Sequence, residues 1–184
     1  KMLFIINKDI PGVIGNIGTL LGKHNINIAE YLLGQINNSD NAYGIVKLNS
    51  KVSEDILSSL RSLTEILDVK QIIIEDACHS LGGSYENGSP VGCGDFSNMS
   101  VFSFHPVKPM TTGEGGAITT NDPELARRLK LYRNHGIERN PDNFINSGFK
   151  KSDVAPWYYE QQTLGFNFRM NDIQASLGIS QLSK

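Results

Sequence analysis

Residues 72–77, Ile72-Ile73-Ile74-Glu75-Asp76-Ala77, decide the fold of the second part of the chain, because they set a carboxylate at the end of a buried strand. Further along, an apolar strand predicted at residues 99–104 leads into Ser103-Phe104-His105-Pro106-Val107-Lys108 and then Thr111-Thr112-Gly113-Glu114-Gly115-Gly116. A lysine among hydroxyls and glycines just after an apolar strand is a good candidate for an amine that binds an aldehyde. Taken singly, Lys108 could be a surface lysine and Asp76 a strand-end aspartate.

Taken together, the lysine and the aspartate predict a cofactor. Pyridoxal phosphate asks a protein for an amine to hold its aldehyde and for an acid to hold its ring nitrogen protonated. Lys108 and Asp76 are therefore the candidate catalytic and cofactor-binding pair. His79 lies three residues after Asp76 and could bond the cofactor's phenolic oxygen, stack beside the ring, or serve only the loop's structure.

The bulk composition is that of an ordinary globular protein. The chain has 184 residues, a hydrophobic fraction of 39%, a charged fraction of 20% and a formal net charge of −2. The absence of a basic block argues against nucleic acid or a membrane surface as the main partner. Cys78 and Cys93 show no pairing pattern, and the apolar run at residues 2–6 is too short for a membrane span, so we expect a cytoplasmic protein.

The first seventy residues alternate between strand and helix patterns. Strands are predicted at residues 2–7, 28–36, 42–48 and 69–74, with helices at residues 13–24 and after the candidate N-cap Ser53. The order strand, helix, strand, strand, helix, strand predicts two helices on one face of a small antiparallel sheet, the ferredoxin-like arrangement. Gly15 and Gly18 weaken the first helix, which makes sense if something must approach its backbone closely.

This first part resembles an ACT domain, the regulatory module found at the end of phosphoglycerate dehydrogenase. The matching runs are Asn7-Lys8-Asp9-Ile10-Pro11-Gly12-Val13-Ile14-Gly15 and Asn25-Ile26-Asn27-Ile28-Ala29. The resemblance implies domains that pack side by side in pairs and can hold a small amino acid as effector. It makes Asn7, Asp9 and Asn27 the candidate ligand contacts, the alternative being that they are turn and cap residues. Many such domains only dimerise.

The second part continues with further strand and helix signals. A strand is predicted at residues 116–120, and Asn121-Asp122-Pro123-Glu124 is typical of a helix start. We expect Leu125, Leu129 and Tyr132 on the inner face of that helix. Residues 138–163 are predicted to form a long irregular loop, followed by a last helix after Asp172.

These motifs resemble the DegT/DnrJ/EryC1/StrS family of sugar aminotransferases, which have the fold-type I pyridoxal phosphate architecture. The matching runs are Glu75-Asp76-Ala77-Cys78-His79-Ser80-Leu81-Gly82, Phe102 to Lys108, Thr111 to Gly116, and Asn167-Phe168-Arg169-Met170-Asn171-Asp172-Ile173-Gln174-Ala175. The resemblance implies that Ser103 binds the cofactor phosphate. It also implies that Asn167 reaches the phosphate in a neighbouring subunit, hence a homodimer.

Two further runs are similar to the pseudaminic acid branch of that family. They are Pro156-Trp157-Tyr158-Tyr159-Glu160-Gln161-Gln162 and Ser180-Gln181-Leu182. Enzymes of this branch aminate a UDP-linked 4-keto-6-deoxy-N-acetylhexosamine with glutamate as the amino donor. The resemblance thus implies a nucleotide-sugar substrate and glutamate as partners.

The sequence therefore predicts an α/β chain of two parts: a ferredoxin-like ACT domain at residues 1–73, and the central fragment of an aminotransferase large domain at residues 74–184. We expect the early strands of the large sheet, the phosphate-binding helix N-terminus and the small domain to be missing. Residues 69–74 would have to end one sheet and begin another, which one strand can hardly do. Three hypotheses remain: an aminotransferase whose turnover by this chain is doubtful, an amino-acid-binding module with a passenger, and a non-functional fusion.

The partial sheet also has a consequence for stability. Parallel core strands without their neighbours leave edges and apolar surface exposed. We therefore expect residues 74–184 expressed alone to be poorly ordered or prone to aggregation. A sharp cooperative melt of that fragment would contradict the expectation.

Overall fold

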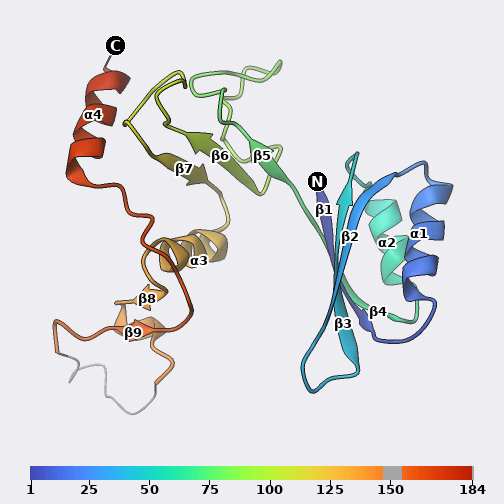
Figure 1. Cartoon of the computed structure of the whole chain (residues 1–184). Coiled ribbons are helices and arrows are strands. Elements are labelled where there is room, and N and C mark those ends of the chain that lie inside the picture. Colours follow the sequence, from blue (N-terminus) through green and yellow to red (C-terminus); the bar gives the residue numbers. More distant parts are fainter. Residues whose placement is uncertain (147–154, 184) are drawn as a thin grey trace. The chain divides into compact units, whose positions relative to one another are not determined.

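The computed structural model describes residues 1–146 and 155–183 and divides the chain into two compact units (Figure 1). The units are Lys1–Ile74 and Glu75–Lys184. The boundary expected from sequence lies one residue earlier, between residues 73 and 74. No helix in the described ranges is long and apolar enough to cross a membrane.

The first unit is a four-stranded antiparallel sheet with the strand order β2-β3-β1-β4. Its strands are β1 (Met2–Lys8), β2 (Ile28–Gln35), β3 (Asn41–Leu48) and β4 (Ile66–Ile72), and its helices are α1 (Val13–Lys23) and α2 (Glu54–Arg61). Both helices lie on the same side of the sheet (Figure 1). The predicted order of elements is confirmed. Whether the unit is an ACT domain stays a prediction.

The core of the first unit follows from two periodicities in the sequence. Along β1, buried Leu3 and Ile5 alternate with half-buried neighbours, as expected for a strand with one covered face. On α1, Ile17 and Leu21 are fully buried four residues apart, and Leu60 is buried on α2. Each such side chain stabilises the fold by about 1.5–3 kcal/mol through removal from water. The helices are therefore held by their apolar stripes rather than by their caps.

The expectation that something approaches the backbone of α1 at its glycines is not met within this chain. A Cβ added to Gly15 or Gly18 would meet no atom within 4 Å among the described residues. Ser53 does precede α2, but its side chain makes no capping hydrogen bond. The N-terminus of α2 instead carries Glu54 and Asp55, whose charges suit the positive end of the helix dipole.

The run predicted as one strand at residues 69–74 serves two sheets. β4 ends at Ile72, pairing with β1, and β5 (Ile74–Asp76) begins after Ile73. β5 lies at the edge of a second sheet with the order β5-β6-β7. The prediction of a single strand was therefore wrong in its bounds. The chain passes from the first sheet to the second at Ile73, so two separate strands end one sheet and begin the other.

The second unit holds little buried apolar material for its size. Besides β5 it contains β6 (Met99–Ser103), β7 (Gly116–Thr119), α3 (Pro123–Arg133), β8 (Ile137–Glu138), the 3-10 turn η1 (Pro141–Asn143), β9 (Glu160–Gln161) and α4 (Asp172–Leu182). Among the described residues of this unit, the buried apolar side chains are Ala77, Phe102, Met110 and Leu131. By contrast, Leu164 is 87% exposed, Ile173 83% and Trp157 80%. The second unit thus exposes large apolar side chains, and the expectation that an incomplete sheet causes this stays a prediction.

Helix α3 begins as predicted and packs differently. Asp122 caps it by accepting the backbone N–H groups of Glu124 and Leu125 at 2.8 and 3.1 Å. The expected inner residue Tyr132 is 49% exposed, whereas Leu131 is buried. The prediction for Tyr132 was therefore wrong, because Leu131 lies about 100° around the helix from Tyr132, so α3 covers a different face.

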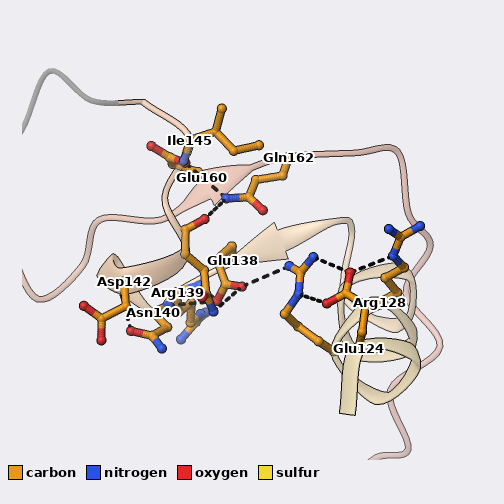
Figure 2. A network of polar contacts seen from close by, with 11 residues as sticks. Glu124, Arg128, Glu138, Arg139, Asn140, Asp142, Ile145, Glu160 and Gln162 are labelled. Carbon is orange, nitrogen blue, oxygen red and sulfur yellow. Dashed lines mark hydrogen bonds and ion pairs between the residues drawn. The ribbon is translucent and has the colours of Figure 1, made fainter. Parts of the chain in front are cut away.

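Two glutamates hold the irregular segment that follows α3 (Figure 2). Glu138 of β8 accepts the backbone N–H of Arg139 at 2.9 Å, and its other oxygen lies 3.7 Å from Arg127 of α3. Glu160 of β9 accepts the backbone N–H of Ile145 at 2.8 Å. The loop predicted at residues 138–163 is thus ordered by carboxylates where it is described. Residues 147–154 of that loop lie outside the described residues.

Candidate active site

Asp76 ends β5 and remains a charged carboxylate. Its Oδ1 accepts the backbone N–H of Cys78 at 3.1 Å, which closes a tight turn after the strand. Hydrogen bonds from the Cys78 side chain and backbone lower the pKa of Asp76, and the positive charges of Lys108 and His79 lower it further. The same contact raises the pKa of the Cys78 thiol, because the proton is shared with a carboxylate. Asp76 is therefore suited to hold a positively charged ring nitrogen.

Lys108 reaches the Asp76 turn from a different strand. The chain leaves β6 at Ser103 and folds into a turn in which the Lys108 N–H donates to the His105 carbonyl at 3.0 Å. The Lys108 Nζ lies 2.6 Å from Nε2 of His79, although the two residues are 29 positions apart in the chain. Amine, imidazole and carboxylate thus form one cluster.

The loop that carries Lys108 is fixed by backbone contacts on both sides. Phe104 donates its N–H to the Gly115 carbonyl at 2.9 Å, and its own carbonyl accepts the Thr112 N–H at 3.0 Å. Helix α4 packs against this loop at Gly178, where a Cβ would come within 3.0 Å of the Thr112 side chain. A larger residue at this position would crowd the Thr112 side chain, which would have to move by a few tenths of an ångström.

Helix α4 itself begins with a capping box that the sequence analysis missed. The Asn171 side chain accepts the Gln174 N–H at 2.9 Å, and the Gln174 side chain accepts the Asn171 N–H at 3.0 Å. The pattern of asparagine followed three residues later by glutamine is the sequence signal that could have found it.

A second carboxylate, Glu75, supports the site from the other face of β5, and its role was also missed. Side chains alternate along a strand, so Glu75 points away from the side that Asp76 faces. Its Oε2 accepts the hydroxyl of fully buried Ser100 at 2.6 Å, and its Oε1 accepts the Tyr85 hydroxyl. The contact with Glu75 raises the pKa of Tyr85 to about 12. Glu75 thus anchors β5 on one face, while Asp76 on the other face interacts with Lys108 and His79.

The structure brings together some of the predicted site residues and not others. Asp76, His79 and Lys108 form the cluster, and Ser103 stands at the start of the Lys108 turn, where its Oγ accepts the His105 N–H at 3.4 Å. Asn167 is engaged elsewhere in the described residues. Its Oδ1 accepts the Arg169 N–H at 3.4 Å, and its backbone forms a bridge with Asn134.

The three candidate contacts in the first unit do not converge. Asn7 is buried near the end of β1, and its Oδ1 has no hydrogen-bond partner in the described part of the chain. Asp9 accepts the Gln35 side-chain amide at 2.7 Å. Asn27 follows α1 and bonds Asn49 through its backbone N–H at 3.1 Å, beside the opposite end of the sheet. Within one unit, Asn27 is therefore separated from the other two by the length of a strand.

The cluster in the second unit fits pyridoxal phosphate by the chemistry of its groups. Lys108 offers an amine, Asp76 an ionised carboxylate coupled electrostatically to that amine, and Ser103 a hydroxyl at the end of the adjacent strand. These are an aldehyde-binding group, a partner for a protonated ring nitrogen and a phosphate donor.

Comparison with known proteins agrees with this chemistry. Residues 56–184 match the model of the DegT/DnrJ/EryC1/StrS aminotransferase family. A UDP-4-amino-4,6-dideoxy-N-acetyl-beta-L-altrosamine transaminase from Helicobacter pylori is 42% identical over 111 residues, which are 60% of this chain and 25% of that protein. The transaminase of the same name from Campylobacter jejuni (serotype O:23/36) is 41% identical over 112 residues, 61% of this chain and 25% of that protein.

Two solved structures are similar to part of this chain. An aminotransferase from Psychrobacter cryohalolentis has a TM-score of 0.51 and 30% identity over 71% of this chain and 29% of its own. The Helicobacter pylori PseC aminotransferase, involved in the biosynthesis of pseudoaminic acid, has a TM-score of 0.49 and 37% identity over 71% of this chain and 29% of its own. The chain spans about a quarter of the length of the curated relatives it matches.

The family match begins further upstream than the sequence motifs predicted. It starts at residue 56 rather than residue 74, so it includes most of α2 and all of β4, which the structure places in the first unit. The match covers well over half of the residues and contains the whole Asp76, His79 and Lys108 cluster. The chain therefore belongs to the DegT/DnrJ/EryC1/StrS aminotransferase family.

Proposed function

We propose that this chain carries the central part of a pyridoxal phosphate-dependent sugar aminotransferase. Its reaction moves an amino group from glutamate to a UDP-linked 4-keto-6-deoxy-N-acetylhexosamine. The observation that carries the proposal is the meeting of Lys108, His79 and Asp76 at the ends of two neighbouring strands. The likeness to UDP-aminosugar transaminases supports the substrate class.

Each residue has a defined task in this proposal. Pyridoxal phosphate, when bound, supplies an aldehyde and a ring that takes up electrons. Lys108 offers its Nζ to the aldehyde and later moves a proton at that same atom. Asp76 keeps its negative charge, since its pKa is lowered, and so holds the ring nitrogen protonated. Ser103 donates its hydroxyl to the phosphate, and Asn167 serves the site of a second subunit in a cytoplasmic homodimer.

Cofactor capture by Lys108 and the complete reaction place different requirements on the protein. The chain spans about a quarter of its curated relatives, and the relatives' whole activity is not assigned to it. We expect Lys108 to capture the cofactor and the complete reaction to need parts of the large sheet that are not among the described residues.

Cofactor capture is tested by trapping it with the full chain. Pyridoxal phosphate is added, the visible absorbance is recorded, borohydride is added, and the modified lysine is found by peptide mass mapping. We expect modification at Lys108 that is lost in Lys108→Ala and retained in Lys130→Ala, which removes an exposed lysine of α3. Modification spread evenly over the lysines would refute the proposal.

A second candidate function rests on the first unit, as an ACT-like module that binds a small amino acid. The specific observation is the Asn7 Oδ1, a buried acceptor without a partner among the described residues. Helix α1 follows in the chain with Gly12 as its N-cap, and it has neither a side-chain cap nor an acid in its first turn. An amino acid could supply an ammonium to the former and a carboxylate to the latter.

This second function predicts ligand-dependent stability. A ligand that binds only the folded state stabilises it by RT ln(1 + [L]/Kd). Serine and other amino acids at millimolar concentration should raise the melting temperature of the full chain, and Asp9→Ala should abolish the rise, whereas Asp40→Ala in the β2–β3 turn should not. An unchanged melting temperature with every amino acid would remove this candidate.

A further inference from the structure

His79 contacts the one nitrogen on which the proposed function depends. The 2.6 Å separation between its Nε2 and Lys108 Nζ is a hydrogen-bond distance, and the imidazole is exposed rather than packed in a core. Two other titratable groups lie nearby: Asp76 interacts with both Lys108 and His79, and the Cys78 thiol interacts with Lys108. His105 belongs to the Lys108 turn, where its Nδ1 accepts the Val107 N–H at 3.4 Å.

A lysine that bonds to an aldehyde needs a proton carrier. The nitrogen gains a positive charge when it forms a bond to the carbonyl carbon and must lose a proton. The hydroxyl formed at that carbon must then gain a proton to leave as water. A histidine changes charge between about pH 5 and 8, so one imidazole can perform both transfers near neutrality.

We propose that His79 is this proton carrier for Lys108. As the bond from Nζ to the aldehyde carbon forms, the carbonyl oxygen takes up a proton from water and becomes a hydroxyl, and a proton passes from Nζ to Nε2 of His79. The same proton then passes to the hydroxyl, the carbon–oxygen bond breaks, and water leaves. No electrons are exchanged with any other group. The inference rests on the proposed function, since it concerns the same lysine, and it assigns to His79 a task beyond contact with the cofactor.

A simple hydrogen-bond partner would have a different signature. Glutamine at position 79 can still accept a hydrogen bond from Nζ, but it cannot take up a proton. Alanine loses both abilities. If His79 only holds the lysine in place, His79→Gln should behave as the unaltered chain. If His79 carries the proton, His79→Gln and His79→Ala should be equally impaired.

The experiment uses formaldehyde, an aldehyde too small to require a cofactor site. The full chain is pulsed with formaldehyde and excess cyanoborohydride from pH 5 to 9, and methylation of each lysine is followed by peptide mass mapping. We expect Lys108 to be methylated faster than Lys130, with a rise in rate between about pH 5 and 8. Both variants should lose that rise and be about 10-fold slower or more at pH 7. The rate at Lys130 is the internal control for folding and reagent.

Several outcomes would overturn the inference. A His79→Gln variant with the original rate and pH profile at Lys108 would reduce His79 to a hydrogen-bond partner. If Lys108 is methylated no faster than Lys130 in the unaltered chain, then no neighbouring group assists the reaction of Lys108. Failure of pyridoxal phosphate to modify Lys108, with the formaldehyde result intact, would instead refute the proposed function and leave the proton carrier standing.

Discussion

Replacing Glu75 by glutamine should loosen the strand that presents Asp76. The Glu75 carboxylate accepts hydroxyl hydrogens from Tyr85 and from buried Ser100. Hydrogen bonds to a charged group contribute about 1.5–3 kcal/mol, against about 0.5–1.5 for neutral ones. Two bonds weakened by about 1 kcal/mol each give a local loss of about 2 kcal/mol. Ser100 can turn to Ser97, whose Oγ lies 3.0 Å away, so we expect no complete collapse.

The Tyr85 hydroxyl provides a direct readout of the same contact. Glu75 raises the pKa of Tyr85 from 10.0 to about 12, because ionising the phenol beside a carboxylate is unfavourable. A raised pKa means that this contribution to stability is complete below about pH 10 and is lost as the pH rises through about 12. Glu75→Gln removes the negative charge, so the pKa of Tyr85 should fall towards 10.

The assay combines titration with hydrogen exchange on the full chain. Tyrosine labelled at the ζ carbon is titrated by NMR, with the Tyr85 signal assigned through Tyr85→Phe, and a fall in its midpoint of about one pH unit or more is expected. The Ala77 N–H, which donates to the Val101 carbonyl at 2.9 Å, should exchange faster at neutral pH. Glu86→Gln is the matched control. An unchanged midpoint for Tyr85 would refute the role given to Glu75.

Five further substitutions test the fold. Gly15→Ala should stabilise the first unit by about 0.4–1 kcal/mol, because helix propensity improves and a Cβ would meet no atom within 4 Å among the described residues. Gly12→Ala should destabilise the unit, because Gly12 has a φ of +93°. Amide exchange in β1 measures both changes. Asp122→Ala should destabilise α3 by about 1 kcal/mol, because it removes the capping hydrogen bond. Ser53→Ala should leave the stability of α2 almost unchanged, because the Ser53 side chain makes no capping hydrogen bond. Hydrogen exchange in each helix measures the two effects. Arg127 and Arg128 lower the pKa of Glu124 to about 2, so its contribution to stability is present above about pH 4.5 and is lost as the pH falls towards 2. In Glu124→Gln, the stability measured by circular dichroism should therefore fall less steeply over this acid range.

Elements of the first unit such as β1 and α1 were predictable because one face of each is buried. Alternation placed Leu3 and Ile5 in a strand, and spacing by four placed Ile17 and Leu21 on a helix. The division after Ile72 was not predictable, since a continuous apolar run has no signal for a change of partner sheet. Tyr132 was misplaced because the sequence does not show which face of α3 is covered, and the structure buries Leu131 instead.

The candidate site was predictable as a set of residues but not as a geometry. Motifs identified Asp76, His79 and Lys108, and the structure brings them together. The contact of His79 with Lys108 joins segments 29 residues apart, and no local pattern encodes it. Glu75 was quoted only as part of a motif, because its partners Tyr85 and Ser100 lie on two other segments.

Only Ile73 separates β4 from β5, so a change in the register of β4 has one residue in which to be absorbed. A slip of β4 by one position against β1 would have to be absorbed at Ile73 or passed on to β5. Since side chains alternate, a slip that is passed on would exchange the faces of Glu75 and Asp76. The register of β4 on β1, in which Ile5 pairs with Val69, is thus set only a few residues along the chain before the two adjacent acids.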